Sequence, residues 1–214
     1  MILPIFASFI VFILILNRAI QRNNKKQRSR ENEFWERERS VNLVRKQSLD
    51  TLNYITFSPA SILPETLLDP AEAAELLQEE KLPPILERLQ ALGDERIVNL
   101  NYITNTDLKA TYGVANLTTL MAYDQNFTDL ITLLQEYAAL LHQHNHPRAA
   151  LKVLQIALDA GSDIGASFLL AADCCLMSDD RDALSGLIQQ AKQLESPRRN
   201  TIVRNLSKYS PNNG

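Results

Sequence analysis

The sequence predicts an all-α fold: an N-terminal transmembrane helix, a helical stalk, and then an α-solenoid of stacked helical hairpins. Three observations lead to this prediction. An apolar run opens the chain and is followed at once by cations. From Asp107 onward, helical patterns follow one another with only short polar joints. Near the C-terminus, small and apolar residues recur after 34 positions. With 45% hydrophobic residues among 214, the chain can bury one core of ordinary size.

Residues 1–20 are the predicted membrane anchor. The run from Met1 to Leu16 contains one polar side chain, Ser8. A helix of about 20 residues crosses a hydrocarbon core of ~30 Å. A cleaved signal peptide is the alternative, but no basic region precedes the run and no small-residue cleavage site follows it. The sequence therefore favours an uncleaved span.

The charges beside this run predict its orientation. Cations follow the run and none precedes it, so the positive-inside rule places the N-terminus outside the cell and the C-terminal domain in the cytoplasm. Cations at this position would also contact anionic headgroups. We predict a single-pass protein of the cell membrane, whose membrane-surface residues are Arg18, Arg22, Lys25, Lys26, Arg28 and Arg30.

Proline and charge divide the rest of the chain. A charged stretch without glycine or proline predicts a helical stalk, and the prolines that follow predict short, interrupted helices over 71–81 and 85–92. Only Ile97 to Tyr102 has strand character. The predicted parts are a stalk over 21–46, a proline-interrupted helical segment over 47–96, a helical repeat domain over 97–210 and a disordered tail over 211–214.

The repeat domain is predicted from a fixed offset between its helices. Residues 34 positions apart match in type at three places, which are Ala138 and Ala172, Leu154 and Ile188, and Ala157 and Ala191. A helix–turn–helix period of about 34 residues is that of the tetratricopeptide repeat. Leu184 departs from the pattern because it stands where the first repeat has Ala150, and a generic helical bundle is the alternative.

One further stretch carries a resemblance. The segments 105–113, 115–117 and 123–127 (NTDLKATYG, ANL and YDQNF) resemble a block in uncharacterised bacterial proteins that have one N-terminal span and a cytoplasmic tetratricopeptide-like domain. The resemblance covers roughly residues 97–205. It implies the same architecture and implies no activity.

A tetratricopeptide array usually receives peptides on its concave face, which the first helix of each hairpin lines. The period places eight residues there as the predicted partner-binding site: Thr132, Gln135, Ala139, His142, Ala166, Leu169, Asp173 and Leu176. This set lacks the lysines and asparagines that clamp a C-terminal carboxylate. A mixed polar and apolar groove for a helix or an extended segment fits it better.

Candidates for chemistry are few. His142, His144 and His146 are the only histidines. The first and last have the i, i+4 spacing of a metal site, although a polar turn is the favoured interpretation. The adjacent Cys174 and Cys175 fit reduced, buried thiols. No catalytic or phosphate-binding motif is present, so we predict no enzyme, no metal and no cofactor.

These observations predict a membrane-anchored scaffold that holds a protein partner and binds no nucleic acid, because the part beyond the juxtamembrane cations is acidic. A self-associating structural protein and a metal-dependent regulator using the histidines are the alternatives. Polar residues around Asn105 to Asp107 and around Asp124 to Asn126 form either a hydrogen-bond network or a ligand groove.

Overall fold

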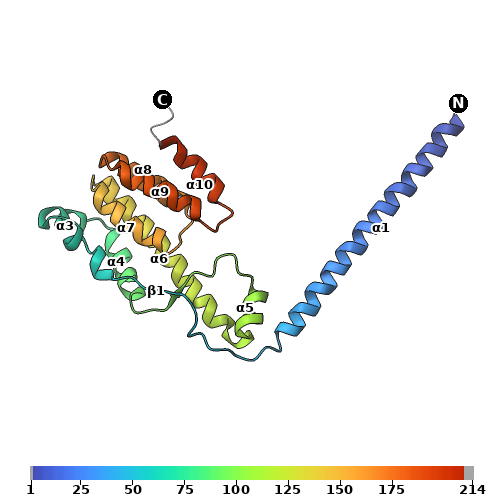
Figure 1. The fold of residues 1–214 in the computed structure, drawn as a ribbon, viewed down its shortest axis with the longest axis horizontal. Helices are drawn as coiled ribbons and strands as arrows, with labels where there is room; N and C mark the ends of the chain where they lie inside the picture. The colour runs from blue at the N-terminus through green and yellow to red at the C-terminus, as the bar shows by residue number, and fades with distance from the viewer. Residues whose placement is uncertain (1, 210–214) are drawn as a thin grey trace. The chain divides into compact units, whose positions relative to one another are not determined.

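A computed structural model describes residues 2–209, with side chains from Leu16 onward. The described chain is almost entirely helical (Figure 1) and falls into two compact units. The first unit comprises the chain up to Leu49 and the segment Ile103–Leu117, and the second comprises the rest. The elements are α1 (Ile2–Val41), β1 (Tyr54–Ile55), η1 (Pro59–Ile62), α2 (Pro64–Leu67), α3 (Pro70–Leu76), α4 (Leu82–Leu92), β2 (Ile97–Val98), α5 (Asn105–Tyr112), η2 (Val114–Asn116), α6 (Leu117–Gln143), α7 (Pro147–Asp159), α8 (Gly165–Met177), α9 (Arg181–Gln193), α10 (Arg199–Leu206) and η3 (Ser207–Tyr209).

The end of α1 packs on α5 in the first unit. The hydroxyl of Thr104 caps α5 by accepting the backbone N–H of Asp107 at 3.2 Å. Beyond α5, the buried Asn116 amide donates to two carbonyl oxygens, those of Gln47 and Tyr112, each at 2.7 Å. These bonds hold the segment that follows α1 against the turn that follows α5.

The predicted membrane span is contradicted by the helices of the described residues. None of them combines the length and the apolar content needed to cross a bilayer. The described side chains of α1, from Leu16 to Val41, include a dense series of arginines, lysines and glutamates, and charged groups are costly in hydrocarbon. The prediction of a single-pass membrane protein with a cytoplasmic domain is corrected accordingly. The side chains of residues 1–15, within the predicted 1–20 span, lie outside the described residues.

The predicted membrane-surface role of the six cations was argued from that span and stays a prediction. The six side chains are exposed along α1. The helix also ends at Val41, before the end of the predicted stalk over 21–46, because turns follow from Asn42 onward. The predicted tail, 211–214, lies outside the described residues.

A small sheet and short helices open the second unit. β1 and β2 pair antiparallel, with Tyr54 opposite Val98 and Ile55 opposite Ile97. A capping box starts α3. The Asp69 side chain accepts the backbone N–H of Glu72, and the Glu72 side chain accepts the backbone N–H of Asp69. The predicted helix over 71–81 ends early, at Leu76, and the predicted strand character over 97–102 is confined to two residues.

Two helical hairpins follow, α6 with α7 and α8 with α9. The first helices, α6 and α8, end at Gln143 and Met177, and the second helices, α7 and α9, begin at Pro147 and Arg181. Both pairs of positions have the same offset that the sequence shows. α8 packs on α7 and α9, and α10 packs on α8 and α9 (Figure 1). α6 is one continuous helix from Leu117 to Gln143.

The turns within the two hairpins have the same geometry. Asn145 and Asp179 both lie in the left-handed region, at φ 62° and 51°. The next N–H then reaches back five residues, from His146 to Leu141 at 2.8 Å in one hairpin and from Asp180 to Cys175 at 2.9 Å in the other. This is the Schellman pattern of helix termination.

The core of the hairpins is built on alanine. Five alanines at the helix crossings are fully buried, with no accessible surface: Ala138, Ala150, Ala157, Ala172 and Ala191. Larger buried side chains fill the space between them, among them Leu134, Tyr137, Leu154 and Phe168. Close helix approach therefore depends on small residues at these positions.

We predict that Gly113→Ala destabilises the first unit by about 1–3 kcal/mol. Gly113 has φ +85°, and an added Cβ would lie 2.6 Å from the carbonyl oxygen of Arg45. Gly186→Ala is the matched control, because its Cβ would meet no atom within 4 Å and alanine is favoured inside a helix by about 0.5–1 kcal/mol. Hydrogen exchange of the amides in α5 and denaturant unfolding measure both. Equal effects of the two substitutions would contradict this account.

Candidate functional site

The predicted partner-binding residues lie on α6 and α8 at spacings of three or four, which place them on one face of each helix. Thr132, Ala166 and Leu176 are exposed. The other five, Gln135, Ala139, His142, Leu169 and Asp173, are half-buried. The face is therefore open in part, while residues beside it such as Leu134 and Ala172 are in the core.

A pocket of about 340 Å³ lies beside the middle of α6, at the joints that precede α8 and α10. Thr132 is the one predicted site residue in it. The lining residues come from the segment after β2, from α6, and from the joints before α8 and α10; they are Asn101, Tyr102, Phe127, Thr128, Ile131, Thr132, Asp163, Ile164, Pro197 and Arg198. Sequence reasoning missed this pocket.

Asp163 is the buried acid of this pocket, with 7% of its surface exposed. Its Oδ2 accepts hydrogen bonds from the hydroxyls of Tyr102 and, at 2.7 Å, Ser196. Its Oδ1 lies 3.9 Å from a guanidinium nitrogen of Arg198. The two hydroxyl donors come from positions 61 and 33 residues away along the chain.

Tyr102 has an unusual backbone for a bulky residue, with φ 71°. Desolvation of its hydroxyl, together with the bond to Asp163, raises the pKa of this phenol. The residue as a whole is 57% exposed. The side chain is therefore held at its polar end and open along its ring, and it forms one wall of the pocket.

A second groove, of about 400 Å³, lies between α8, α9 and η3. Its lining includes Cys175, Leu176, Leu184 and Tyr209. Leu176, a predicted site residue, is 52% exposed there. The groove adds apolar surface at the other end of α8.

The three histidines contact separate groups. His144 Nε2 lies 3.0 Å from the carboxylate of Glu79, and His146 Nδ1 lies 4.0 Å from that of Glu72. His142 Nε2 is buried and has no hydrogen-bond partner among the described residues. In that part of the chain, no three histidine, cysteine or carboxylate side chains gather as a metal site would require. The histidines and glutamates join α3 and the loop after it to the turn between α6 and α7.

The polar stretch at Asn105 to Asp107 contacts the end of α1. Thr106 donates to Glu38, which Lys109 also pairs with at 2.7 Å. Both partners of that ion pair are largely covered, with side chains 17% and 15% exposed. Arg37 pairs with Asp107 at 2.6 Å. These bonds engage Thr106 and Asp107, and the bonds from Lys109 and Thr106 hold the pKa of Glu38 below its ordinary value.

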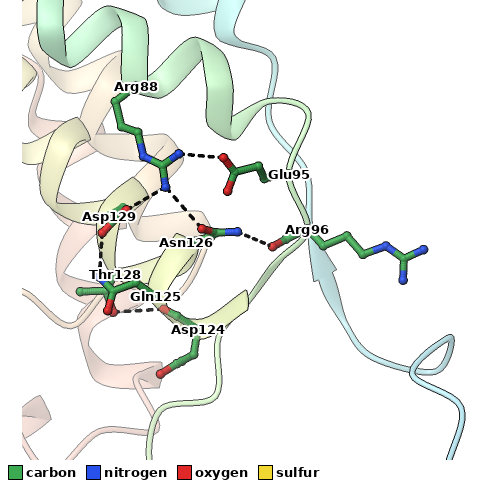
Figure 2. Close-up of polar contacts among 8 residues, drawn as sticks. All are labelled: Arg88, Glu95, Arg96, Asp124, Gln125, Asn126, Thr128 and Asp129. Carbon is green, nitrogen blue, oxygen red and sulfur yellow. Dashed lines mark hydrogen bonds and ion pairs between the residues drawn. The ribbon is translucent and has the colours of Figure 1, made fainter. Parts of the chain in front are cut away.

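The polar stretch at Asp124 to Asn126 belongs to a network centred on Arg88 (Figure 2). The Arg88 guanidinium pairs with Glu95 at 2.7 Å and with Asp129 at 2.9 Å, and Figure 2 shows its contact with Asn126. The Asn126 amide donates in turn to the carbonyl oxygen of Arg96 at 3.0 Å. The network ties α4 and the approach to β2 onto α6.

Asp124 adds a bond of the same kind, because its Oδ1 accepts the backbone N–H of Leu100 at 3.0 Å. Tyr123 packs its ring edge-on to Tyr54, with centroids 6.0 Å apart. These side chains fix the segment 96–100 along α6, and this segment leads directly to Tyr102 in the pocket.

The two cysteines are free and buried. Burial, and then the charges nearby, raise the pKa of Cys174 to about 12. Burial and Asp180 raise the pKa of Cys175 to about 11. Neither thiol is poised as a nucleophile, since the thiolate is the reactive form.

Comparison with protein-family models, with curated proteins and with solved structures finds no match to this chain.

We predict that Asp129→Asn removes part of the acid sensitivity of the second unit. Burial alone would raise the pKa of Asp129, but bonds from Arg88 and Gln125 outweigh it and lower the pKa. A lowered pKa stabilises the fold above the unfolded value of about 3.9, and this contribution is lost as pH falls through the folded pKa. The variant should lose about 1 kcal/mol at pH 7 and show a flatter decline below pH 4 in urea unfolding. Asp94→Asn is the control, an exposed acid next to the network. An unchanged pH profile in Asp129→Asn would contradict the assignment.

We predict slow thiol labelling in the folded chain. Both sulfurs are buried and protonated at pH 8, so native protein should react with a disulfide reagent at least tenfold more slowly than urea-unfolded protein. Absorbance of the released thiolate measures the rate. Fast labelling of the native state would show that α8 opens readily.

Proposed function

We propose that α6 to α10 form a tetratricopeptide-like array, with two complete hairpins and the first helix of a third, that binds a segment of a partner protein. The observation that carries the proposal is the recurrence of structure at one constant offset along the chain. Helix ends, left-handed turn residues and buried alanines all recur at this interval. That period is the one expected of tetratricopeptide hairpins.

The same interval brings α10 into the array. α8 begins at Gly165 and α10 at Arg199. Before each helix, a serine hydroxyl accepts the backbone N–H two residues on, from Ile164 to Ser162 at 3.3 Å and from Arg198 to Ser196 at 3.0 Å. Phe168 and Ile202, which are separated by the same interval, are both buried. We therefore assign α10 as the first helix of a third hairpin.

A binding role fits the composition of the candidate face. In such arrays the first helices line an extended concave surface. The first helices here carry exposed and half-buried residues of mixed polarity, among them Thr132, Ala166 and Leu176. The second unit also contains 20 acidic and 11 basic residues, a formal net charge of −9. A field of this sign favours basic partners.

Self-association is the second candidate, and one observation favours it. Leu16, Ile20, Phe34 and Trp35 are large apolar side chains that are all at least 48% exposed on α1. Ile20 and Phe34 each follow Leu16 by close to a whole number of helical turns, so these three side chains lie on nearly the same side of the helix. Such a stripe could be covered by a second copy of α1.

We predict partner cross-links from the first helices and none from the second helices. A photo-crosslinking residue at Thr132 or Ala166, each in the full chain inside cells, should give a discrete adduct with another protein. Lys152 and Gln189 are matched controls, because they are exposed on α7 and α9. Mass spectrometry identifies the adduct.

The adduct also separates the two candidate functions. A heterologous partner recovered from Thr132 and Ala166 but not from Lys152 and Gln189 supports the array. Adducts of the chain with itself alone would support self-association. Equal cross-linking at all four positions would contradict a binding face on the first helices.

A further inference from the structure

The pocket beside the middle of α6 and the joints before α8 and α10 combines a buried charge with apolar walls. Its acid, Asp163, is 7% exposed, and two of its walls, Phe127 and Ile131, are 0% and 5% exposed. Ile164 adds a half-buried aliphatic side chain. A volume of about 340 Å³ falls in the range of small-ligand sites, about 300–1,000 Å³.

Only one of the two carboxylate oxygens of Asp163 accepts hydrogen bonds within the described part of the chain. Its Oδ2 accepts from the hydroxyls of Tyr102 and Ser196. Its Oδ1 has an ion-pair contact with Arg198 at 3.9 Å, which is too long for a hydrogen bond. A buried carboxylate oxygen without a close donor has capacity for one more cationic N–H group.

Arg198 is a weak internal occupant of that position. Its side chain is 66% exposed, and it lies on the rim of the pocket. An exposed ion pair at such a distance contributes little to stability. A cation from outside, with a stem that packs in the pocket, can therefore displace it.

The walls define the rest of the ligand. Ile164 and the exposed Tyr102 side chain offer apolar surface to a hydrocarbon stem, above the buried Phe127 and Ile131, while the carboxylate lies at the polar end. Lysine and arginine side chains have this form, with an aliphatic stem and a charged head. The net charge of −9 on the second unit attracts the same class of side chain.

We propose that this pocket is an anchor site for a lysine or arginine side chain of a partner protein, with Asp163 as the charge partner and Arg198 as an internal competitor. The proposal rests on the proposed function, since it names the class of residue by which a partner would dock on the first helices. Tyr102 and Ser196 are positioning residues, because they hold the carboxylate by its other oxygen.

The test is a titration of the 15N-labelled full chain, followed by amide shifts near Thr128 and Ile164. The probes are Nα-acetyl-lysine amide, Nα-acetyl-arginine amide and Nα-acetyl-norleucine amide, the last being an uncharged analogue of the lysine stem. The cationic probes should bind at least tenfold more tightly than the norleucine probe. Their binding should also weaken with added salt.

Three variants sharpen the test. Asp163→Asn keeps an acceptor for the two hydroxyls and removes the charge, so binding of the lysine probe should fall at least tenfold. Arg198→Ala removes the competitor, so the same probe should bind severalfold more tightly. Arg199→Ala is the matched control, an exposed neighbour outside the pocket lining, and should leave binding within twofold of the original.

The gain in Arg198→Ala decides the matter even if Asp163→Asn fails to fold, because a purely structural ion pair predicts no gain. Equal binding of the lysine and norleucine probes, no binding of either cation, or weaker binding in Arg198→Ala would overturn the proposal. Cross-links from Thr132 and Ala166 without any lysine-dependent shift would leave the array intact and remove only this pocket. Shifts without cross-links would keep the pocket and remove the proposed partner-binding function.

Discussion

The close crossing of the hairpin helices is the constraint on which the second unit depends. Ala138, Ala150, Ala157 and Ala191 supply small side chains at the crossings and have no exposed surface. Because protein interiors pack at the density of organic crystals, a larger residue in place of one of these alanines would part the helices and open the layer beside it. Leu184, which stands where the first hairpin has Ala150, is a larger side chain that is also buried, with 3% exposed.

The turns within the hairpins set where each helix ends and the next begins. With Asn145 and Asp179 in the left-handed region, each first helix stops at a defined residue and its partner begins four residues later. The second helices, α7 and α9, have equal length and start in phase. The starts of α8 and α10, together with the middle of α6, consequently lie around one pocket, where Asp163 and Arg198 meet.

The long-range polar bonds have a different role. Arg88 joins α4 to α6, and Asp124 fixes Leu100 along the same helix. Each bond is modest by itself, since partly exposed ion pairs contribute little. Together they hold the segment that leads to Tyr102 in the pocket. The backbone of Tyr102 has a conformation that a tyrosine seldom adopts. The polar residues for which the sequence left a hydrogen-bond network or a ligand groove open are thus mostly engaged with neighbouring segments.

The sequence by itself determined the helices after Thr128, their joints and the constant interval between them, because helix propensity, helix-breaking residues and apolar spacing all act over a few residues. It did not determine the continuity of α6 or the early end of α3. The apolar run at the N-terminus led to a membrane span that the described helices do not bear out. Only the tertiary structure decided the pairing of His144 with Glu79 and the cluster of Tyr102, Asp163 and Ser196. These groups lie 33 to 94 residues apart along the chain, and packing across the whole unit, which no local pattern encodes, brings them together.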